Sequence, residues 1–238
     1  MYLSSYIIND SIAIDAGALG LMSPIEAQAK VRHVLISHSH IDHIATLPIF
    51  VDNVHDADRD CVIVHGSQTV LECLQRDVFN GCVWPDFVKM TPEHGSFLKL
   101  SLLETGVAVK LDGLRITPVA VAHTVPTLGF MIEDHSAAIA MVSDTGPTDQ
   151  IWDLANRTPN LKAVFLEASF PNSLADIADI SQHLTPALFA KEIDKIKKPL
   201  RIIAVHLKPR FRAQLERELR ELNRPNLEIV EPGVAYEF

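Results

Sequence analysis

The chain has 238 residues, a hydrophobic fraction of 47% and a formal net charge of −9. A domain has about 100–200 residues and a buried core needs this apolar content, so we expect one folded domain covering residues 1–238 and exclude a largely disordered chain. The acidic balance argues against nucleic acid as the main partner, because such binding needs Lys and Arg to neutralise phosphates.

The start of the chain and its cysteines indicate a cytoplasmic protein. The first residues lack the basic region of a secretory signal, and no apolar run reaches the ~18 residues of a membrane-spanning helix. Cys61, Cys73 and Cys82 are an odd number without two-residue spacing, which favours reduced thiols over a disulfide framework. We therefore expect no membrane partner.

In chain order, short apolar runs rich in β-branched residues predict strands, and apolar residues at helical spacing predict helices. The strands are expected at residues 12–15, 31–37, 62–64, 114–122, 137–142, 163–166 and 201–205. The helices are expected at residues 68–79 behind Ser67, 187–197 behind Thr185 and Pro186, and 211–222. Asp112-Gly113 predicts a short turn between strands, and the mixture of strands and helices predicts a layered α/β or α+β fold.

The strongest local pattern is a run of six residues, His38-Ser39-His40-Ile41-Asp42-His43, directly after the strand expected at 31–37. Side chains two apart on an extended backbone point to the same side, so His38 and His40 can share one metal. Asp42 and His43 follow where the chain turns, and can face a second metal. Imidazole and carboxylate ligands suit zinc, manganese or iron. The alternative is a polar loop with accidental histidines.

Three further donors follow strands later in the chain. His123, Asp144 and His206 each come at the end of an apolar run. Functional side chains gather at such strand ends in mixed α/β sheets. Each residue alone is more easily a structural one. Their order behind the six-residue pattern makes them candidate ligands.

The pattern resembles the His-x-His-x-Asp-His motif of the metallo-β-lactamase superfamily. This resemblance implies a four-layer αββα sandwich and two divalent metals, with zinc as the first candidate. It implies that Asp15 holds the motif loop in place without touching metal; the alternative for Asp15 is a turn cap. His65 is a second candidate for a residue that supports the site without binding metal. The implied ligands are His38, His40 and His123 for one metal, Asp42, His43 and His206 for the other, and Asp144 as the bridge.

More restrictive segments resemble the class II cyclic-nucleotide phosphodiesterases. They are residues 74–87, 142–147, 165–172, 183–186 and 205–209, and the resemblance runs from about residue 12 to the end of the chain. It implies hydrolysis of a small 3′,5′-cyclic nucleotide, cAMP first, to a 5′-monophosphate, and suggests a homodimer. The chain is short for that family, and we expect its first strand and a Gly-rich turn near the start to be missing.

The implied chemistry suits phosphodiester hydrolysis. Two metals about 3.5–4 Å apart and bridged by Asp144 suit phosphoryl transfer, and coordination lowers the pKa of water from 15.7 to about 7, so a bridging hydroxide is available as nucleophile. His183 and Glu167 resemble the histidine–carboxylate pair with which related nucleases protonate the leaving oxygen. The alternative for this pair is a structural hydrogen bond.

Candidate substrate contacts are less specific. Trp84 and Phe87 lie in a Pro-interrupted stretch and are candidates to stack on a purine, although aromatic residues after a helix more often fill a core. Lys208 follows His206 closely, with Arg210 and Arg212 behind it, and is a candidate contact for the substrate phosphate. Three other histidines in polar surroundings are expected at the surface: His55, His94 and His135.

Two other functions compete with this hypothesis. A tRNA 3′-processing nuclease of the same superfamily must hold a long polyanion, and the sequence contains no basic arm for it. A metal-binding scaffold without turnover is the alternative outside enzymes. All seven ligand positions are filled, which argues against such a scaffold.

Overall fold

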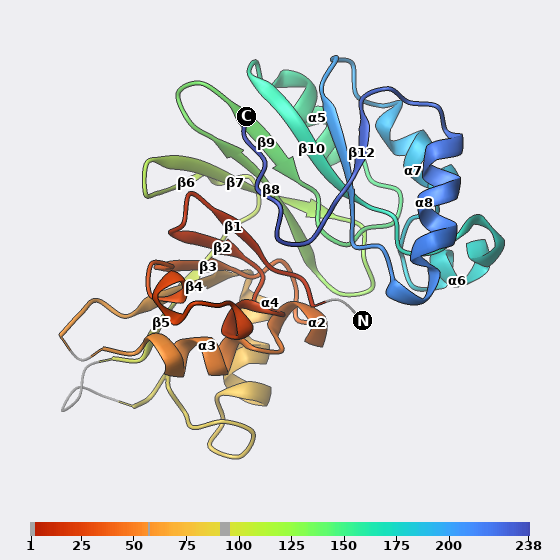
Figure 1. Cartoon of the computed structure of the whole chain (residues 1–238). Coiled ribbons are helices and arrows are strands. Elements are labelled where there is room, and N and C mark those ends of the chain that lie inside the picture. Colours follow the sequence, from red (N-terminus) through yellow and green to blue (C-terminus); the bar gives the residue numbers. More distant parts are fainter. Residues whose placement is uncertain (1–2, 57, 91–95) are drawn as a thin grey trace. The chain divides into compact units, whose positions relative to one another are not determined.

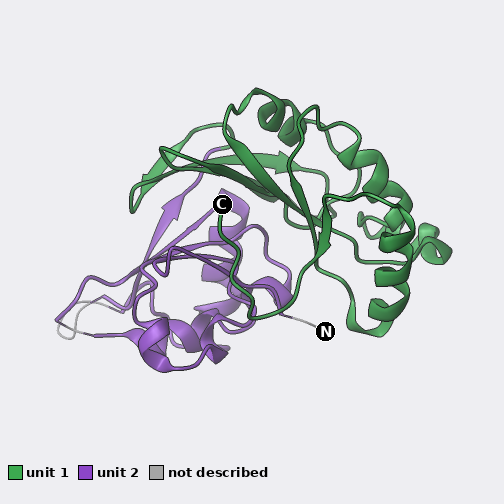
Figure 2. Cartoon of the chain, turned by 45° about the horizontal axis from the view of Figure 1, so that its top comes forward, with its two compact units in different colours: residues 1–2, 105–238 green, residues 3–104 purple. Residues whose placement is uncertain are grey.

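The strands pair into two separate sheets in the computed structural model, which describes residues 3–56, 58–90 and 96–238 (Figure 1). The chain divides into two compact units: unit 2 comprises residues 3–104, and unit 1 comprises residues 105–238 (Figure 2). Each unit contains one sheet with helices, which confirms the mixed α/β fold expected from the sequence. His94 lies outside the described residues.

Unit 2 contains a five-stranded sheet in the order β1-β2-β3-β4-β5. Only β1 and β2 are antiparallel, and the other neighbours are parallel. Helices α3 and α4 pack on one face of the sheet through a core that includes Val34, Val64, Phe50 and Leu74. The strands are β1 (Tyr6–Ile8), β2 (Ile12–Ile14), β3 (His33–Leu35), β4 (Val62–Gly66) and β5 (Leu98–Leu102); the helices are η1 (Leu19–Leu21), α1 (Ile25–Gln28), α2 (Ile41–Ile44), α3 (Leu47–Val54), α4 (Gln68–Cys73) and the π-helical turn η2 (Leu74–Val78).

The expectation that the first strand is missing is wrong. Strand β1 pairs with β2, with Ile8 opposite Ile12. The turn between them places Asn9 and Asp10 at φ values of 48° and 62°, a left-handed backbone that Asn and Asp tolerate better than most residues. The sequence predicted β2, which is equally short at three residues, but did not predict β1.

Unit 1 contains a seven-stranded sheet in the order β12-β11-β10-β9-β8-β7-β6. Neighbours from β6 to β9 are antiparallel, and those from β9 to β12 are parallel. The predicted turn at Asp112-Gly113 joins β6 to β7, with both residues at positive φ. The strands are β6 (Val109–Leu111), β7 (Leu114–Val121), β8 (Thr127–Glu133), β9 (Ala138–Met141), β10 (Leu161–Glu167), β11 (Arg201–Val205) and β12 (Leu227–Ile229).

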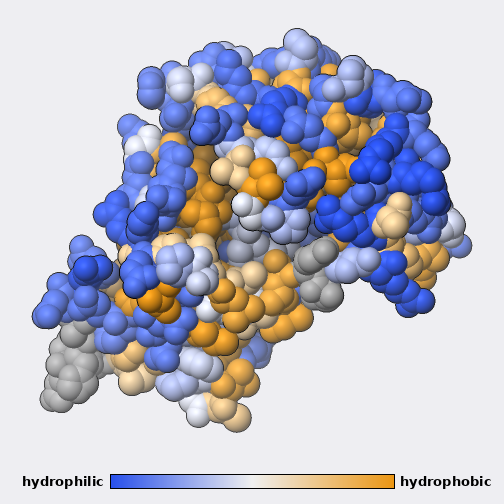
Figure 3. Space-filling model, viewed as in Figure 1, coloured by the Kyte–Doolittle hydropathy of each residue, from blue (hydrophilic) through white to orange (hydrophobic). Residues whose placement is uncertain are grey.

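Three helices of unit 1 cover one face of this sheet, as Figure 1 shows: α5 (Gln150–Arg157), α7 (Pro186–Ile193) and α8 (Arg212–Glu221). Figure 3 shows hydrophilic side chains over the outer face of α8. Helix α7 starts as predicted, because the side chain of Thr185 accepts a hydrogen bond from the Leu188 N–H and Pro186 occupies the first turn. The shorter helices are η3 (Asn172–Leu174), α6 (Ala175–Ile180) and η4 (Pro209–Phe211).

No helix in the part of the chain that the structure describes combines the length and the apolar character needed to cross a lipid bilayer.

A buried carboxylate connects α5 to α7. Glu192 is 2% exposed and accepts hydrogen bonds from Trp152 Nε1 at 2.7 Å and from the Thr148 N–H at 3.2 Å. Its other oxygen lies 2.9 Å from Lys195 Nζ. Burial of a charge is costly unless it is paired and hydrogen-bonded, and Glu192 meets both conditions.

We predict that Glu192→Ala lowers the free energy of unfolding by about 2–4 kcal/mol, because it leaves the buried indole N–H without its acceptor and removes the lysine's buried partner. Urea denaturation measures the change. Glu221→Ala is the matched control, since Glu221 is exposed at the end of α8. A loss below 1 kcal/mol for Glu192→Ala would contradict this account of the contact between α5 and α7.

Candidate functional site

Most of the predicted site residues of unit 1 lie at one edge of its sheet. Asp144 follows β9, Glu167 ends β10 and His206 follows β11, and these three strands are parallel neighbours. His123 follows β7, which runs in the same direction as β9 because each is antiparallel to β8. The carboxyl ends of these strands therefore meet at the same edge, where binding sites on such sheets form.

In unit 2, the six-residue motif begins just after β3 and continues into α2. His38 Nε2 lies 3.0 Å from His40 Nδ1. Two nitrogens bound to zinc at about 2.0–2.1 Å with tetrahedral angles lie about 3.4 Å apart. The separation of the two imidazole nitrogens is therefore close to that of two ligands of one metal.

Asp15 holds the motif in place from the end of β2. It is 2% exposed, and its carboxylate accepts hydrogen bonds from Ser37 N at 2.8 Å, from Ser37 Oγ at 2.9 Å and from His43 Nδ1 at 2.7 Å. The Ser37 hydroxyl gives its one proton to Asp15, so it accepts the Nδ1 proton of His38 at 3.0 Å. Both imidazoles therefore carry their lone pair on Nε2, as metal-binding histidines do when a neighbour fixes Nδ1.

The same arrangement recurs in unit 1. His123 Nδ1 donates to the Gln182 carbonyl at 2.9 Å. Ser169 Oγ donates to the His206 carbonyl at 3.1 Å, so it accepts the His206 Nδ1 proton at 3.0 Å. His206 Nε2 lies 3.5 Å from Asp144 Oδ2. Burial lowers the pKa of His123, which favours the neutral imidazole that a metal requires.

A backbone hydrogen bond joins the loop that carries Asp144 to the loop that carries His123. Gly146 N donates to the Ala122 carbonyl at 2.6 Å. Asp144, His123 and His183 offer ligand atoms that all lie within 4.8 Å of one another. The donors of both units, imidazole nitrogens and carboxylate oxygens with fixed outer hydrogen bonds, fit the hard to intermediate divalent metals expected from the sequence.

His183 and Glu167 form the pair expected from the sequence. His183 Nδ1 lies 2.5 Å from Glu167 Oε1, and both residues are buried. The carboxylate also accepts hydrogen bonds from Thr145 N at 2.9 Å and from Leu184 N at 3.3 Å. Burial opposes the charged imidazole, but the charge and hydrogen bond of Glu167 outweigh it and raise the pKa of His183. His183 is thus positioned to carry a proton beside Asp144, whose Oδ2 is 4.0 Å from its Nδ1.

The sequence did not predict the residues that fix the imidazoles. Ser37, Ser169 and Gln182 each contact a candidate ligand through a hydroxyl or a carbonyl. The only signal for Ser37 is its position beside His38. Ser169 is 37 residues from His206 and Gln182 is 59 residues from His123, so no local pattern indicates those contacts.

Phe87 requires a correction. It is 3% exposed and stacks on Phe97 at 4.1 Å between ring centroids, within the core of unit 2. A buried ring between other rings offers no face to a purine, so Phe87 fills the core, the alternative that the sequence left open. Trp84 is half-buried against the same core, and its stacking on a substrate stays a prediction.

His65 is buried in β4 and lies beside His33, with 3.0 Å between His65 Nε2 and His33 Nδ1. Burial, together with the neighbouring imidazole of His33, lowers the pKa of His65 to about 4. His33 is not among the predicted ligands. That His65 holds a metal ligand in place without binding the metal therefore stays a prediction.

Lys208 lies close to His183, because both contact Phe170. The Lys208 ammonium is 4.9 Å from the centre of the Phe170 ring, and that ring is 5.7 Å from the His183 ring. Arg212 instead pairs with Glu216 at 2.7 Å and donates to the Val230 carbonyl at 3.1 Å. Arg212 is therefore committed to structural contacts.

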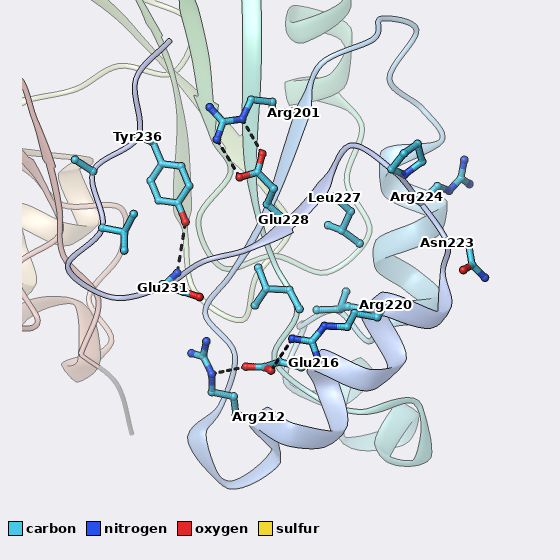
Figure 4. A pocket seen from close by; sticks show the side chains of 15 residues that line it. Arg201, Arg212, Glu216, Arg220, Asn223, Arg224, Leu227, Glu228, Glu231 and Tyr236 are labelled. Atoms are coloured by element: carbon cyan, nitrogen blue, oxygen red, sulfur yellow. Dashed lines mark hydrogen bonds and ion pairs between the residues drawn. The ribbon is translucent and has the colours of Figure 1, made fainter.

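A cavity of about 830 Å³ lies between α8, β12 and the last residues of the chain (Figure 4). None of the predicted metal ligands line it. Its guanidinium groups are each paired with a carboxylate: Arg201 with Glu228, Arg212 and Arg220 with Glu216, and Arg224 with Asp194. The cavity therefore has little charge left to attract an anionic substrate.

Comparison with known proteins supports the sequence resemblance. The family model described as a beta-lactamase superfamily domain matches residues 12–207. A 3′,5′-cyclic-nucleotide phosphodiesterase of Aliivibrio fischeri is 24% identical over 207 residues, which cover 75% of this chain and 60% of that protein. The chain thus spans about 60% of the length of this curated relative.

Two solved structures share the fold. Unliganded yeast PDE1 matches with a TM-score of 0.73 and 22% identity, covering 86% of this chain and 67% of the yeast chain. The short form of human tRNase Z matches with a TM-score of 0.68 and 14% identity, covering 97% of this chain and 93% of the human one. Proteins with different names thus share this fold, and the fold alone does not choose a substrate.

We predict that Asp15→Asn lowers the affinity for zinc by about 10–100-fold, because an amide cannot accept all three hydrogen bonds that orient Ser37 and His43. Asn also tolerates the left-handed backbone of Asp15, whose φ is 60°. Competition with a chromophoric chelator measures the affinity. Asp10→Asn is the control, since exposed Asp10 has a similar φ of 62°; equal affinities in both variants would contradict the role given to Asp15.

Proposed function

We propose that this chain, which belongs to the β-lactamase superfamily, is a metal-dependent phosphodiesterase. In this proposal it converts 3′,5′-cyclic nucleotides to 5′-monophosphates, with cAMP as the first candidate substrate. The chain is a metallo-β-lactamase-fold hydrolase, and this fold implies divalent metal ions. The observation that carries phosphodiester hydrolysis is the buried His183–Glu167 pair beside Asp144. The match to a 3′,5′-cyclic-nucleotide phosphodiesterase supports a cyclic nucleotide as the substrate.

In this proposal, the donors of the two units serve one centre with two metals, zinc first and manganese or iron as alternatives. His38, His40 and His123 hold one ion, Asp42, His43 and His206 hold the other, and Asp144 is shared. The fixed Nδ1 protons of four of these imidazoles support the assignment. Two such ions would lower the pKa of water and polarise the phosphoryl oxygens.

His183 supplies the leaving group's proton. Hydrolysis joins a water oxygen to phosphorus and breaks the bond from phosphorus to the 3′-oxygen, which leaves as an alkoxide unless it receives a proton. His183 has its Nδ1 proton committed to Glu167, so the imidazolium donates from Nε2. The Glu167 carboxylate favours the charged ring before transfer and keeps its orientation afterwards.

Lys208 serves the phosphate in the same proposal. The salt bridges of the described residues do not include Lys208, and its ammonium lies over the half-buried Phe170 ring. Phe170 therefore positions a cation near His183 without neutralising it. Such a charge attracts the phosphate of a small nucleotide, although the chain as a whole is acidic.

We predict that the purified chain loaded with zinc or manganese converts cAMP to 5′-AMP, and that prolonged dialysis against EDTA abolishes turnover until metal is restored. Chromatography of the nucleotides measures the reaction, with cGMP and a structured RNA as competing substrates. Cleavage of the RNA without cyclic-nucleotide turnover would support a nuclease instead. A fully metallated chain without turnover on any of them would support a scaffold.

We predict that His183→Ala retains both metals and lowers turnover at least tenfold, about 1.4 kcal/mol of barrier, because the leaving oxygen loses its proton donor. Steady-state kinetics and metal analysis on the same sample test this. His135→Ala is the control, since His135 is exposed in a loop. Near-normal turnover by fully metallated His183→Ala would end the assignment of His183 as acid.

A further inference from the structure

We infer that the N-terminal segment, residues 4–18, positions Asp42 and His43 for metal binding by capping the backbone of the motif helix α2. The inference rests on the proposed metal role of these two residues. It assigns a function to residues that lie at least 20 positions before the motif and carry no ligand themselves.

Helix α2 has only four residues, Ile41–Ile44, and cannot satisfy its own carbonyl groups. In a continuing helix, Thr46 N would donate to the Asp42 carbonyl. Thr46 N instead donates to the Ala16 carbonyl at 3.0 Å. The carbonyls of the two candidate ligand residues therefore need donors from elsewhere.

The N-terminal segment supplies those donors. Ser4 N donates to the Asp42 carbonyl at 2.8 Å, and Ala16 N donates to the His43 carbonyl at 2.7 Å. Both are backbone groups, so the contacts do not depend on a particular side chain at either position. The peptide groups of the two ligand residues are thus fixed by a separate stretch of chain.

The capping segment is itself tightly held. Gly17 N donates to the Ser4 carbonyl at 2.9 Å, and Ala18 N donates to Ser5 Oγ at 3.0 Å. A Cβ atom at residue 17 would lie 1.9 Å from the Asp42 carbonyl oxygen and 2.7 Å from Ser4 N. Only glycine allows the segment to approach the motif this closely.

The segment controls one pair of ligands more directly than the other. It holds the backbone of Asp42 and His43, and Asp15 within it holds the His43 ring. Metal–ligand distances in well-formed sites lie within about 0.2 Å of their usual values, so the ligand atoms must be placed accurately. Loss of the caps is therefore expected to weaken the metal of Asp42 and His43 before that of His38 and His40.

The test compares Ser4→Pro, which deletes the Ser4 N–H, with Ser4→Ala, which keeps it. Metal analysis after dialysis against a weak chelator and zinc titration give the stoichiometry and both affinities, and the visible spectrum of the cobalt-substituted chain reports ligand geometry. We expect Ser4→Pro to retain one ion of two, with affinity for the second at least tenfold lower and an altered cobalt spectrum. Ser4→Ala is expected to match the wild type.

Two further variants keep the test decisive. Gly17→Ala displaces the segment by steric contact, and a chain that starts at Ser5 lacks the donor without adding a proline ring. Wild-type zinc affinity in any folded variant without the Ser4 N–H overturns the inference. Circular dichroism that shows all three variants unfolded also overturns it, because the segment would then serve folding. A wild-type chain that binds no zinc contradicts the proposed function and the inference together.

Discussion

Left-handed backbone at four non-glycine residues is the constraint on which the candidate site depends. Asp15, Ser143, Gln182 and His206 have φ values from 51° to 63°. Each such residue costs of order 1–3 kcal/mol, so the surrounding contacts must over-determine it. The Ser169 hydroxyl hydrogen-bonds both the ring and the carbonyl of His206, and the Asp15 carboxylate accepts three hydrogen bonds. At these residues the chain changes direction sharply. The change keeps the donor groups at the strand ends, whereas a regular backbone would place them farther along.

Much of this arrangement was predictable because its signals are local. The six-residue motif after a β-branched run, and single His or Asp residues after later strands, placed the candidate ligands at strand ends, as found at β9 and β11. Caps at Ser67 and Thr185 were equally local and hold the helix starts as expected. Such patterns involve only neighbouring residues, which is why the sequence alone indicates them.

The rest depends on contacts between distant segments. Strand β8 was not predicted, since Gly129 weakens its pattern; the glycine is needed because a Cβ there would lie 2.8 Å from Ile151. Phe87 comes two residues after Pro85, so its local sequence resembles a loop. The rings that pack against Phe87 come from other segments of the chain, and no local pattern indicates these contacts. The hydrogen bonds from Ser169 and Gln182 span dozens of residues, and only the folded sheet brings their partners together.

The hydroxyl, carboxylate and carbonyl groups that hold the Nδ1 protons of His38, His43, His123 and His206 also have a statistical effect. A neutral imidazole exists as two tautomers, and only one presents Nε2 to a cation. If each of four rings divided equally between them, about one molecule in 16 would have all four rings ready, a loss of about 1.6 kcal/mol in apparent affinity. A homologue could therefore keep every ligand of the motif and still bind its ions weakly, because the rings would spend most of their time in the wrong tautomer.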